Sequence, residues 1–319
     1  MTLITTDINL ASEMLKNEDV IGMPTETVYG LAGNIYSEKA IKKIYEIKKR
    51  PFINPLIVHI KSLECLNKVA INVSESALKL ANTFWPGPLT LILDKHSSIP
   101  DLITAGKNTV AVRIPNHPVA LALLEIVNFP LAAPSANPFG CISPTSAKHV
   151  AEYFNDEISI VLEGGNCQKG IESTIIGFRN KQPILYRHGS ISVQEIEAVV
   201  GKLEILTKND SAPEAPGMLS KHYAPITETF LTNDVIEFIK KSPHKKIGLL
   251  LFKQEIDNQK IIHQEVLSKS GDLKEAASNL YAALHRLDKL NLDIIIAEQF
   301  PDIGLGKTIN DRLERATKR

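Results

Sequence analysis

Residues 47–60 read IKKRPFINPLIVHI, a stretch in which three cations stand before a proline and a short apolar run. Pro51 disfavours helical backbone at Arg50, so a helix that comes before it is expected to end near Ile47 or Lys48. If the following residues are extended, Lys48 and Arg50 point to the same side, because side chains alternate along a strand. The two cations would then form a fork suited to phosphate oxygens. The alternative is a solvated helix end, where lysines favour the helix dipole.

Outward from this junction, residues 1–203 alternate amphipathic segments with short β-branched runs. The spacing of apolar residues predicts helices at 7–17, 37–48, 74–84, 117–127, 145–154 and 192–200, with Ser37 and Ser74 as N-caps. It predicts strands at 19–23, 56–60, 89–93, 109–114, 130–133, 158–162, 172–177 and 183–187. This alternation is typical of an α/β or α+β domain around a twisted sheet.

The remainder of the chain predicts a second, smaller domain. Helix 233–241, strand 247–252, helix 271–290, strand 292–297 and a basic helix at 308–318 indicate a small parallel-sheet, Rossmann-like unit. We therefore expect a larger domain at 1–203, a linker at 204–230 and a smaller carboxy-terminal domain at 231–319. The linker contains Met218, Leu219, His222 and Tyr223 between prolines, whereas a passive tether is polar and rich in glycine and serine. It is predicted to be a lid over a ligand site, with interdomain packing as the alternative.

Composition narrows the possible classes of function. The chain has 319 residues, more than one core usually holds, and its 36 basic and 36 acidic residues balance. A net charge near zero argues against strong nonspecific binding to nucleic acid or membrane, so any RNA binding is expected to be weak.

The three cysteines are scattered, without a C-x-x-C pair, which indicates reduced thiols and no zinc site. The first residues lack a signal-peptide pattern and no apolar run is long enough to span a bilayer, so we expect a cytoplasmic protein.

Polar residues follow a strand in PLAAPSANPFGCISPT, residues 130–145. Ser135 and Asn137 share a side if the segment is extended. Small hydroxyl and amide groups at the carboxyl end of a strand are typical of a polar ligand site. A serine- and threonine-rich turn that caps the next helix is the alternative, and it accounts for Thr145 only.

An arginine interrupts the apolar pattern of NTVAVRIPNHP, residues 108–118. Val110, Val112 and Ile114 lie on one face of the predicted strand, and Thr109, Ala111 and Arg113 lie on the other. An arginine beside apolar strand residues needs an anionic partner, because an unpaired buried charge is costly. That partner is either a structural carboxylate or the carboxylate of a substrate.

Six motifs in order resemble one enzyme family. PTETVYGL, KKRPFINPLIVHI, VAVRIPNHP, APSAN with SPT, ESTII and APGMLSKHYAP are similar to motifs of the YrdC-like threonylcarbamoyl-AMP synthases, in their two-domain form. The resemblance implies a YrdC-like twisted mixed sheet with flanking helices. It also implies an L-threonylcarbamoyladenylate synthase, a nucleotidyltransferase that condenses L-threonine, bicarbonate and ATP to L-threonylcarbamoyl-AMP and pyrophosphate. The adenylate would pass to a complex that forms N6-threonylcarbamoyladenosine in tRNA.

The same resemblance implies site residues. Its K-x-R element falls on Lys48 and Arg50, as catalytic cations, and its S-x-N element falls on Ser135 and Asn137. The implied ATP-binding residues are Arg50, Asn54, Thr109, Ser135, Asn137, Ser143, Arg187 and Tyr223. The implied threonine-binding residues are Thr27, His59, Arg113, Ala133 and Ser173. Mg²⁺ is expected to arrive with ATP rather than on a protein metal site.

Two other functional hypotheses stay open, and one motif is rejected. The chain could be an RNA-binding or ribosome-maturation module, although its charge balance argues against this, or a carbamoyltransferase with another acceptor, although it lacks room for further domains. PDIGLGKT, residues 301–308, resembles the end of a phosphate-binding loop but has Pro301 where the first glycine is needed. We therefore expect a glycine-rich turn before the basic terminal helix.

Overall fold

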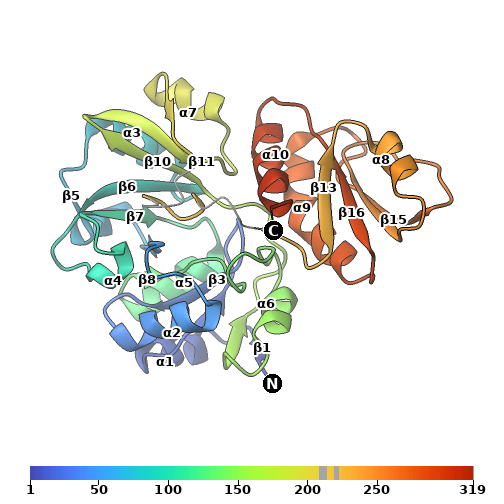
Figure 1. The fold of residues 1–319 in the computed structure, drawn as a ribbon. Coiled ribbons are helices and arrows are strands. Elements are labelled where there is room, and N and C mark those ends of the chain that lie inside the picture. Colours follow the sequence, from blue (N-terminus) through green and yellow to red (C-terminus); the bar gives the residue numbers. More distant parts are fainter. Residues whose placement is uncertain (208–213, 219–222, 319) are drawn as a thin grey trace.

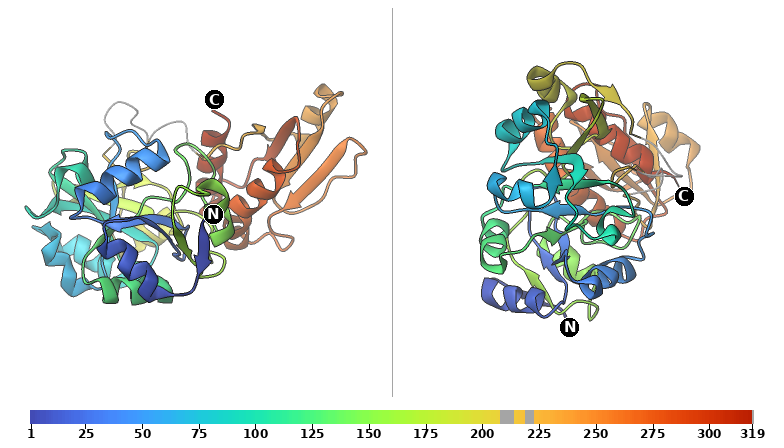
Figure 2. Two further views of the ribbon diagram at one scale, coloured as in Figure 1. Left: turned by 90° about the horizontal axis from the view of Figure 1, so that it is seen from below. Right: turned by 90° about the vertical axis from the view of Figure 1, so that its left-hand side faces the viewer.

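The computed structural model describes residues 1–207, 214–218 and 223–318, which form two α/β units side by side (Figures 1 and 2). A mixed 12-stranded sheet forms the larger unit and a 4-stranded sheet the smaller one. This confirms the predicted α/β class, a twisted mixed sheet with flanking helices plus a smaller parallel-sheet domain. The domain boundaries at 203 and 231 stay predictions, and Leu219 and His222 of the predicted lid lie outside the described residues.

The large sheet brings distant segments together as neighbours. Its strands run in the order β1 (Leu3–Thr5), β9 (Ile160–Leu162), β2 (Ile21–Met23), β3 (Gly30–Asn34), β8 (Leu131–Ala132), β4 (Ile57–His59), β7 (Thr109–Arg113), β6 (Leu89–Lys95), β10 (Thr174–Arg179), β11 (Gln182–Arg187) and β12 (Glu204–Ile205), with β5 (Ala70–Ile71) paired to β6. The helices of this unit are α1 (Ile8–Lys16), α2 (Glu38–Lys48), η1 (Leu63–Lys68), α3 (Glu75–Phe84), α4 (Asp101–Thr104), α5 (Pro118–Val127), α6 (Ala147–Tyr153) and α7 (Val193–Val200).

Serine caps fix where the helices begin. The side chains of Ser37, Ser74, Ser146 and Ser192 accept hydrogen bonds from the backbone amides of the third residue beyond them, at the starts of α2, α3, α6 and α7. Each such cap contributes about 1 kcal/mol relative to alanine. These hydrogen bonds confirm the predicted N-caps Ser37 and Ser74. The prediction was possible because a hydroxyl followed by a periodic apolar run is a local sequence signal.

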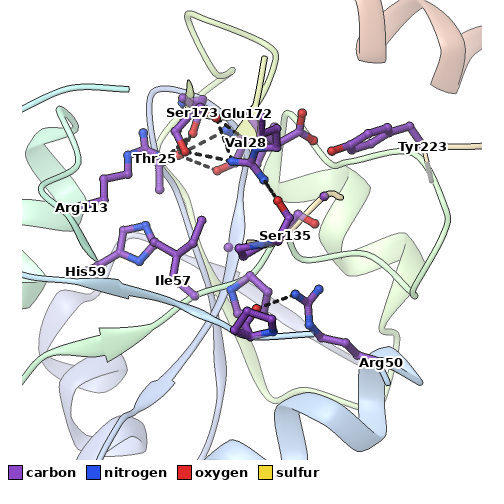
Figure 3. Close-up of a pocket in the computed structure, with 18 residues that line it drawn as sticks. Thr25, Val28, Arg50, Ile57, His59, Arg113, Ser135, Glu172, Ser173 and Tyr223 are labelled. Carbon is purple, nitrogen blue, oxygen red and sulfur yellow. Dashed lines mark hydrogen bonds between the residues drawn. The ribbon is translucent and has the colours of Figure 1, made fainter. Parts of the chain in front are cut away.

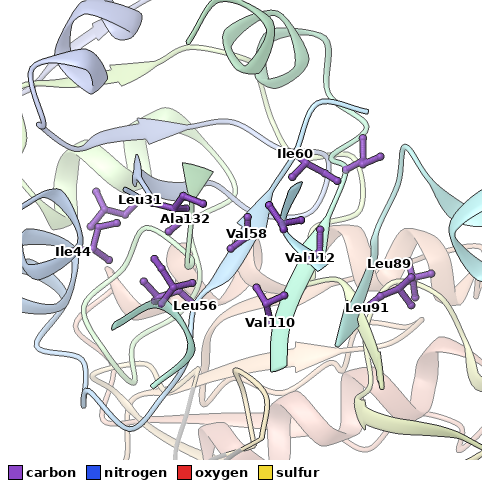
Figure 4. Packing of buried hydrophobic residues seen from close by; sticks show 14 of the residues in the cluster. Leu31, Ile44, Leu56, Val58, Ile60, Leu89, Leu91, Val110, Val112 and Ala132 are labelled. Atoms are coloured by element: carbon purple, nitrogen blue, oxygen red, sulfur yellow. The ribbon is translucent and has the colours of Figure 1, made fainter. Parts of the chain in front are cut away.

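The two faces of the central strands have different roles (Figure 4). Val58, Val110 and Val112 lie in the main hydrophobic core, whereas His59 and Arg113 on the alternate positions line a pocket. The predicted division of residues 109–114 into two faces is thus confirmed. Burying a valine contributes roughly 1.5–3 kcal/mol, so a one-residue slip, which would exchange the faces, is strongly disfavoured.

The smaller unit is an all-parallel sheet. Its strands run in the order β13 (Glu228–Thr232), β16 (Ile294–Glu298), β14 (Ile247–Leu251) and β15 (Ile261–Val266), and its helices are α8 (Val235–Lys241), α9 (Leu273–Asp288) and α10 (Leu305–Ala316). Strands β1, β3, β5, β12, β13 and β15 were not predicted. The sequence of β3, GLAGN, contains no β-branched residue, and β13 and β15 mix polar and apolar residues without clear turn residues. Within the described residues, no helix is long and apolar enough to cross a membrane.

The glycine-rich turn predicted within residues 301–308 ends sooner than expected, at Gly304. Helix α10 already begins at Leu305, so Gly306, Lys307 and Thr308 are helical. A side chain at residue 306 would stand 1.9 Å from the Pro301 carbonyl oxygen, so glycine is needed there for close packing. Rejection of a phosphate-binding loop is consistent with this geometry.

The two units share a buried core. Helices α9 and α10 face the larger unit (Figure 1), and one apolar cluster joins Val28 and Ile171 of the larger unit to Leu280 and Ile309 of the smaller. At Gly170 a side chain would meet the Ser278 backbone oxygen at 2.1 Å, so only glycine permits this approach of the backbones. The larger unit and α9 and α10 therefore meet as packed surfaces.

Candidate active site

A pocket that is partly open to solvent lies on the face of the large sheet opposite to its core. The pocket is lined by Thr25, Thr27, Val28, Gly30, Arg50, Pro55, Ile57, His59, Arg113, Ala133, Pro134, Ser135, Glu172, Ser173, Arg187, Pro216, Gly217 and Tyr223. Figure 3 shows Arg113 and His59 at one end and Arg50 and Tyr223 at the other.

Arg113, on β7, organises the first end. Its Nη1 donates to Thr27 Oγ1 at 2.9 Å and its Nε donates to the Gly87 carbonyl at 3.2 Å. Its Nη2 lies 2.7 Å from Glu26 Oε1, and both side chains are buried. The anionic partner that the sequence required is therefore present as a structural carboxylate, which holds the guanidinium in place and prevents the cost of an unpaired buried charge.

His59, on β4, is the register partner of Arg113. Burial, together with the Arg113 guanidinium, lowers the pKa of His59 to about 3, so its imidazole is neutral at physiological pH. Its Nδ1 atom is buried without a hydrogen-bond partner among the described residues. A neutral imidazole with an unused nitrogen beside an arginine is suited to a hydrogen bond with a ligand hydroxyl or amine.

Arg50 supplies a cation at the other end. Its Nε donates to the Asn54 carbonyl at 3.1 Å, and its Nη2 donates to Asn54 Oδ1 at 2.7 Å and to the Pro55 carbonyl at 2.8 Å. Burial lowers the pKa of Arg50 to about 10, which leaves it protonated. Asn54 is thus not in the pocket lining but fixes the guanidinium that is.

The predicted fork of Lys48 and Arg50 is wrong in its geometry. Helix α2 continues through Lys48, and Lys49 adopts a left-handed conformation, φ 52° and ψ 38°, so residues 48–50 are not extended. Lys48 does not line the pocket; its Nζ donates to the carbonyls of Ser135 and Asn137 at 2.5 Å each. Burial, with the nearby Arg50, holds the pKa of Lys48 well below its usual range.

Arg187, at the end of β11, crosses the pocket wall to the segment before β10. Its Nε and Nη2 donate to the Ser173 carbonyl at 3.1 and 2.9 Å, and its Nη2 also donates to Ser173 Oγ at 2.9 Å. Ser173 Oγ lies 2.7 Å from Thr90 Oγ1. A third buried guanidinium, after those of Arg113 and Arg50, therefore lines the pocket with a fixed orientation.

The pocket gathers some predicted site residues and leaves out others. It is lined by all five residues implied for threonine, which are Thr27, His59, Arg113, Ala133 and Ser173. Of those implied for ATP it is lined by Arg50, Ser135, Arg187 and Tyr223, whereas Asn54, Thr109, Asn137 and Ser143 lie outside the lining. Lys48, implied as a catalytic cation, also lies outside it.

The residues outside the lining support those inside it. Asn137 Nδ2 donates to the carbonyls of Pro138 and Cys141, at 3.0 and 2.9 Å, which closes the turn after Ser135. Ser143 Oγ donates to Glu172 Oε1 at 2.6 Å. Thr109 stands at the start of β7, four residues before Arg113, and is not among the residues that line the pocket.

Sequence reasoning missed several residues of this site. Glu26 and Glu172 are buried carboxylates beside Thr27 and Ser173, and the identity of their cationic partners is not visible in the local sequence. Arg312 reaches Glu172 from α10, 140 positions away. Within the described part of the chain, no group of three or more histidine, cysteine, aspartate or glutamate side chains could hold a metal ion.

Known proteins share this fold and sequence. A family model described as telomere recombination, with the label Sua5, YciO and YrdC, matches residues 13–189, and a model described as the threonylcarbamoyl-AMP synthase C-terminal domain matches residues 191–317. The threonylcarbamoyl-AMP synthase of Pyrococcus abyssi is 40% identical, over 97% of this chain and 94% of its own. That of Bacillus subtilis is 39% identical, over 96% of this chain and 91% of its own.

A solved structure shows the same similarity to a threonylcarbamoyl-AMP synthase. The crystal structure of P. abyssi Sua5 complexed with L-threonine superimposes with a TM-score of 0.90 at 39% identity, covering 97% of this chain and 94% of that one. The agreement extends over both units, so the similarity is not confined to the larger sheet.

Proposed function

The chain belongs to the threonylcarbamoyl-AMP synthase family, and from this premise we propose that its pocket binds L-threonine at the Arg113 end and ATP at the Arg50 end. The protein is an L-threonylcarbamoyladenylate synthase, a nucleotidyltransferase that uses L-threonine and ATP. The observation that carries the assignment of the two ends is the separation of His59 and Arg113 from Arg50 and Tyr223 across one pocket (Figure 3).

At the threonine end, the proposed contacts follow from the donors and acceptors present. Arg113, oriented by Glu26, presents its positive charge to the substrate carboxylate. The neutral imidazole of His59 and the hydroxyls of Thr27 and Ser173 are suited to the substrate hydroxyl and amine. The Ala133 amide already donates to the Ile57 carbonyl at 3.1 Å, so we assign the Ala133 carbonyl to the substrate ammonium.

At the ATP end, Arg50 and Arg187 neutralise phosphate charge, Ser135 hydrogen-bonds to a phosphate oxygen, and Tyr223 covers the nucleotide. Lys48, first expected to be catalytic, is proposed to act through the Ser135 loop, because its ammonium group is bonded to that loop.

Asn54, Asn137 and Ser143 are likewise proposed to position their neighbours. Thr109 was implied as an ATP contact by the family motif, and any role in ATP binding stays a prediction.

Mg²⁺ is proposed as part of the MgATP substrate. No group of three or more histidine, cysteine, aspartate or glutamate side chains among the described residues could hold a metal ion, and the Glu172 carboxylate in the pocket wall is occupied by Arg312, Tyr281 and Ser143. These residues therefore do not fit a dedicated metal site. The ion would be held by phosphate oxygens and water, as is usual for Mg²⁺ with nucleotides.

The proposed reaction has two displacements. The amine of L-threonine attacks the carbon of bicarbonate, and water leaves to give a carbamate. A carbamate oxygen then attacks the α-phosphorus of ATP, the bond to the β-phosphate oxygen breaks, and pyrophosphate leaves. This chain contributes by holding the two substrates in line and by placing Arg50 and Arg187 near the developing negative charge. We further propose that the adenylate passes in the cytoplasm to a tRNA threonylcarbamoyl-transferring complex.

One assay tests the proposed function. The protein is incubated with MgATP, bicarbonate and single amino acids, while pyrophosphate and the adenylate are measured. We expect release of pyrophosphate only when L-threonine and bicarbonate are both present. Release that depends on RNA, with none from L-threonine, would contradict the proposal and favour an RNA-binding module. Release with another acceptor in place of threonine would favour a different carbamoyltransferase.

A further inference from the structure

Glu172 is a negative charge where an anionic substrate is expected. Among the described residues that line the pocket it carries the only carboxylate, beside the guanidinium groups of Arg50, Arg113 and Arg187. Its side chain is buried, so water screens its charge poorly. A triphosphate that enters this pocket therefore meets both favourable cations and one unfavourable anion, unless the anion is neutralised from elsewhere.

The partners of Glu172 come mainly from the smaller unit. Tyr281 of α9 donates its hydroxyl to Glu172 Oε2 at 2.9 Å, and Arg312 of α10 donates its Nε to the same oxygen at 2.9 Å. From the larger unit, Ser143 Oγ donates to Oε1 at 2.6 Å. The carboxylate is thus hydrogen-bonded on both oxygens, and its partner in a salt bridge is Arg312.

Arg312 is itself fixed by the protein rather than directed into the pocket. It is only 1% exposed and is not among the lining residues. Its Nη2 donates to the His188 carbonyl at 2.5 Å and its Nη1 to Asp311 Oδ2 at 2.5 Å. Its guanidinium carbon lies 4.7 Å from the ring centroid of Tyr223, a cation–π contact with a residue that does line the pocket.

An arginine near an ATP site could bind phosphate directly or could neutralise another charged residue, and the contacts of Arg312 distinguish these two roles. Arg312 is almost fully buried and, unlike Arg50 and Arg187, does not line the pocket, which argues against direct phosphate binding. Protonation does not remove the charge of Glu172 either: burial alone would raise its pKa, but Arg312, Arg187 and the Ser143 hydroxyl lower the pKa to about 2. The negative charge persists at working pH and must be balanced by a cation.

We propose that Arg312, supplied by the smaller unit, is a positioning residue of the ATP site that neutralises Glu172 and holds Tyr223, so that the pocket presents a net positive charge to the triphosphate. The inference rests on the proposed function of this pocket and gives α10 a part in it. The smaller unit then completes the nucleotide site electrostatically without touching the nucleotide.

The test uses a double-mutant cycle in the full-length protein, with Arg312→Met, Glu172→Gln and the double variant. Glutamine keeps a carbonyl oxygen as an acceptor for Tyr281 and Arg312 but removes the charge. Binding of MgATP and, separately, of L-threonine is measured by calorimetry. Arg286→Met is the matched control, since Arg286 is an exposed arginine on α9 that pairs with Glu265 away from the pocket.

We expect Arg312→Met to weaken MgATP binding about tenfold or more, as for loss of a buried charge pair, and to leave L-threonine binding within about twofold. In the Glu172→Gln background the same change is expected to cost less than about threefold, because no charge remains to be neutralised. Arg286→Met is expected to change neither ligand.

Three outcomes would overturn the inference. An equal loss of MgATP affinity in both backgrounds would mean that Arg312 acts on the nucleotide itself. A folded Arg312→Met protein with a lower melting temperature but wild-type affinity for MgATP would mean a purely structural role. If Arg312→Met does not fold, Glu172→Gln alone decides: it is expected to bind MgATP at least as tightly as wild type, and weaker binding overturns the inference. A wild-type protein that binds no MgATP would instead contradict the proposed function.

Discussion

His59 and Arg113 are register partners in the parallel strands β4 and β7, and both side chains reach the same end of the pocket. The neighbouring positions Val58 and Val112 are also register partners and lie in the core. The alternation of a strand therefore fixes two pocket residues and two core residues with one register. Because the core resists a slip of this register, the spacing of the two pocket residues is rigid.

Replacement of Arg113 by alanine is expected to weaken L-threonine binding by roughly 10- to 100-fold, as for loss of a charge-assisted hydrogen bond. MgATP binding should stay close to wild type, because Arg113 lies at the other end of the pocket from Arg50 (Figure 3). Titration calorimetry with each ligand checks this. Equal losses of both ligands would contradict separate subsites.

This change also leaves the Glu26 carboxylate buried without its cation, which is expected to cost about 3–5 kcal/mol of stability. The double variant with Glu26→Gln is therefore the control. It should regain much of the stability but not the affinity for L-threonine. Recovery of both would mean that Arg113 serves the fold alone.

Replacement of Arg50 by alanine is expected to have the opposite selectivity. MgATP binding should weaken by roughly tenfold or more, while L-threonine binding should stay within about twofold. The matched variant is Lys49→Ala, which removes an exposed cation from the adjacent residue and is expected to change neither ligand. If Lys49→Ala weakens MgATP binding as much as Arg50→Ala, a diffuse positive surface, rather than the Arg50 side chain, attracts the nucleotide.

The neutral state of His59 predicts a pH dependence of stability. Its pKa is about 3 in the folded protein and about 6.5 in the unfolded chain, so the unfolded chain binds the proton first as pH falls. The stability contributed by the neutral imidazole is thus fully present above about pH 6.5 and declines below it, by up to about 1.4 kcal/mol per pH unit. His149 and His285, with pKa values of about 3 and 4, act in the same direction.

Urea unfolding between about pH 5 and pH 6.5 measures this slope, in a range where carboxylates contribute little. His59→Gln should make the slope shallower, by at most the amount that one bound proton contributes. A slope identical in wild type and His59→Gln would mean that His59 is not held neutral in the folded protein.

Local pattern sufficed to predict much of the fold, whereas the residues proposed to bind L-threonine were implied by the family resemblance. The two faces of residues 109–114 follow from alternation alone, and the serine caps follow from a hydroxyl before an apolar run. The prediction failed at Lys48 because Pro51 restricts residue 50 but not residue 49, and no sequence signal marks the left-handed conformation of Lys49. With Lys49 in the left-handed conformation, Lys48 stays helical and its ammonium group points toward the Ser135 carbonyl.

The contacts between the two units could not be predicted from the sequence, for a different reason. Arg312 and Glu172 are 140 positions apart, and one belongs to the smaller unit and the other to the larger. Their pairing therefore depends on how α10 packs against the larger unit. Neither helical nor strand periodicity contains that information. The sequence did place an arginine in a basic terminal helix, but an arginine on a helix is usually solvated, and nothing local marks this one as buried.

The predicted lid can be tested at Tyr223, because this residue lines the pocket and also packs against the smaller unit. It lines the pocket, its ring lies 5.8 Å from that of Tyr281 on α9, and it is buried. Removing all of this packing with alanine would lower stability whatever the role in ATP binding, so Tyr223→Leu is the better change.

If Tyr223 covers the nucleotide, the Tyr223→Leu variant should show a smaller ATP-induced rise in melting temperature than wild type and faster loss of the adenylate to hydrolysis. Tyr153→Leu is the control: its ring lies 5.6 Å from that of His285, at the same interface but outside the pocket lining, and it should lower stability without changing the ATP-induced shift. A Tyr223→Leu protein that melts earlier yet gains the same shift as wild type would show that Tyr223 only joins the two units.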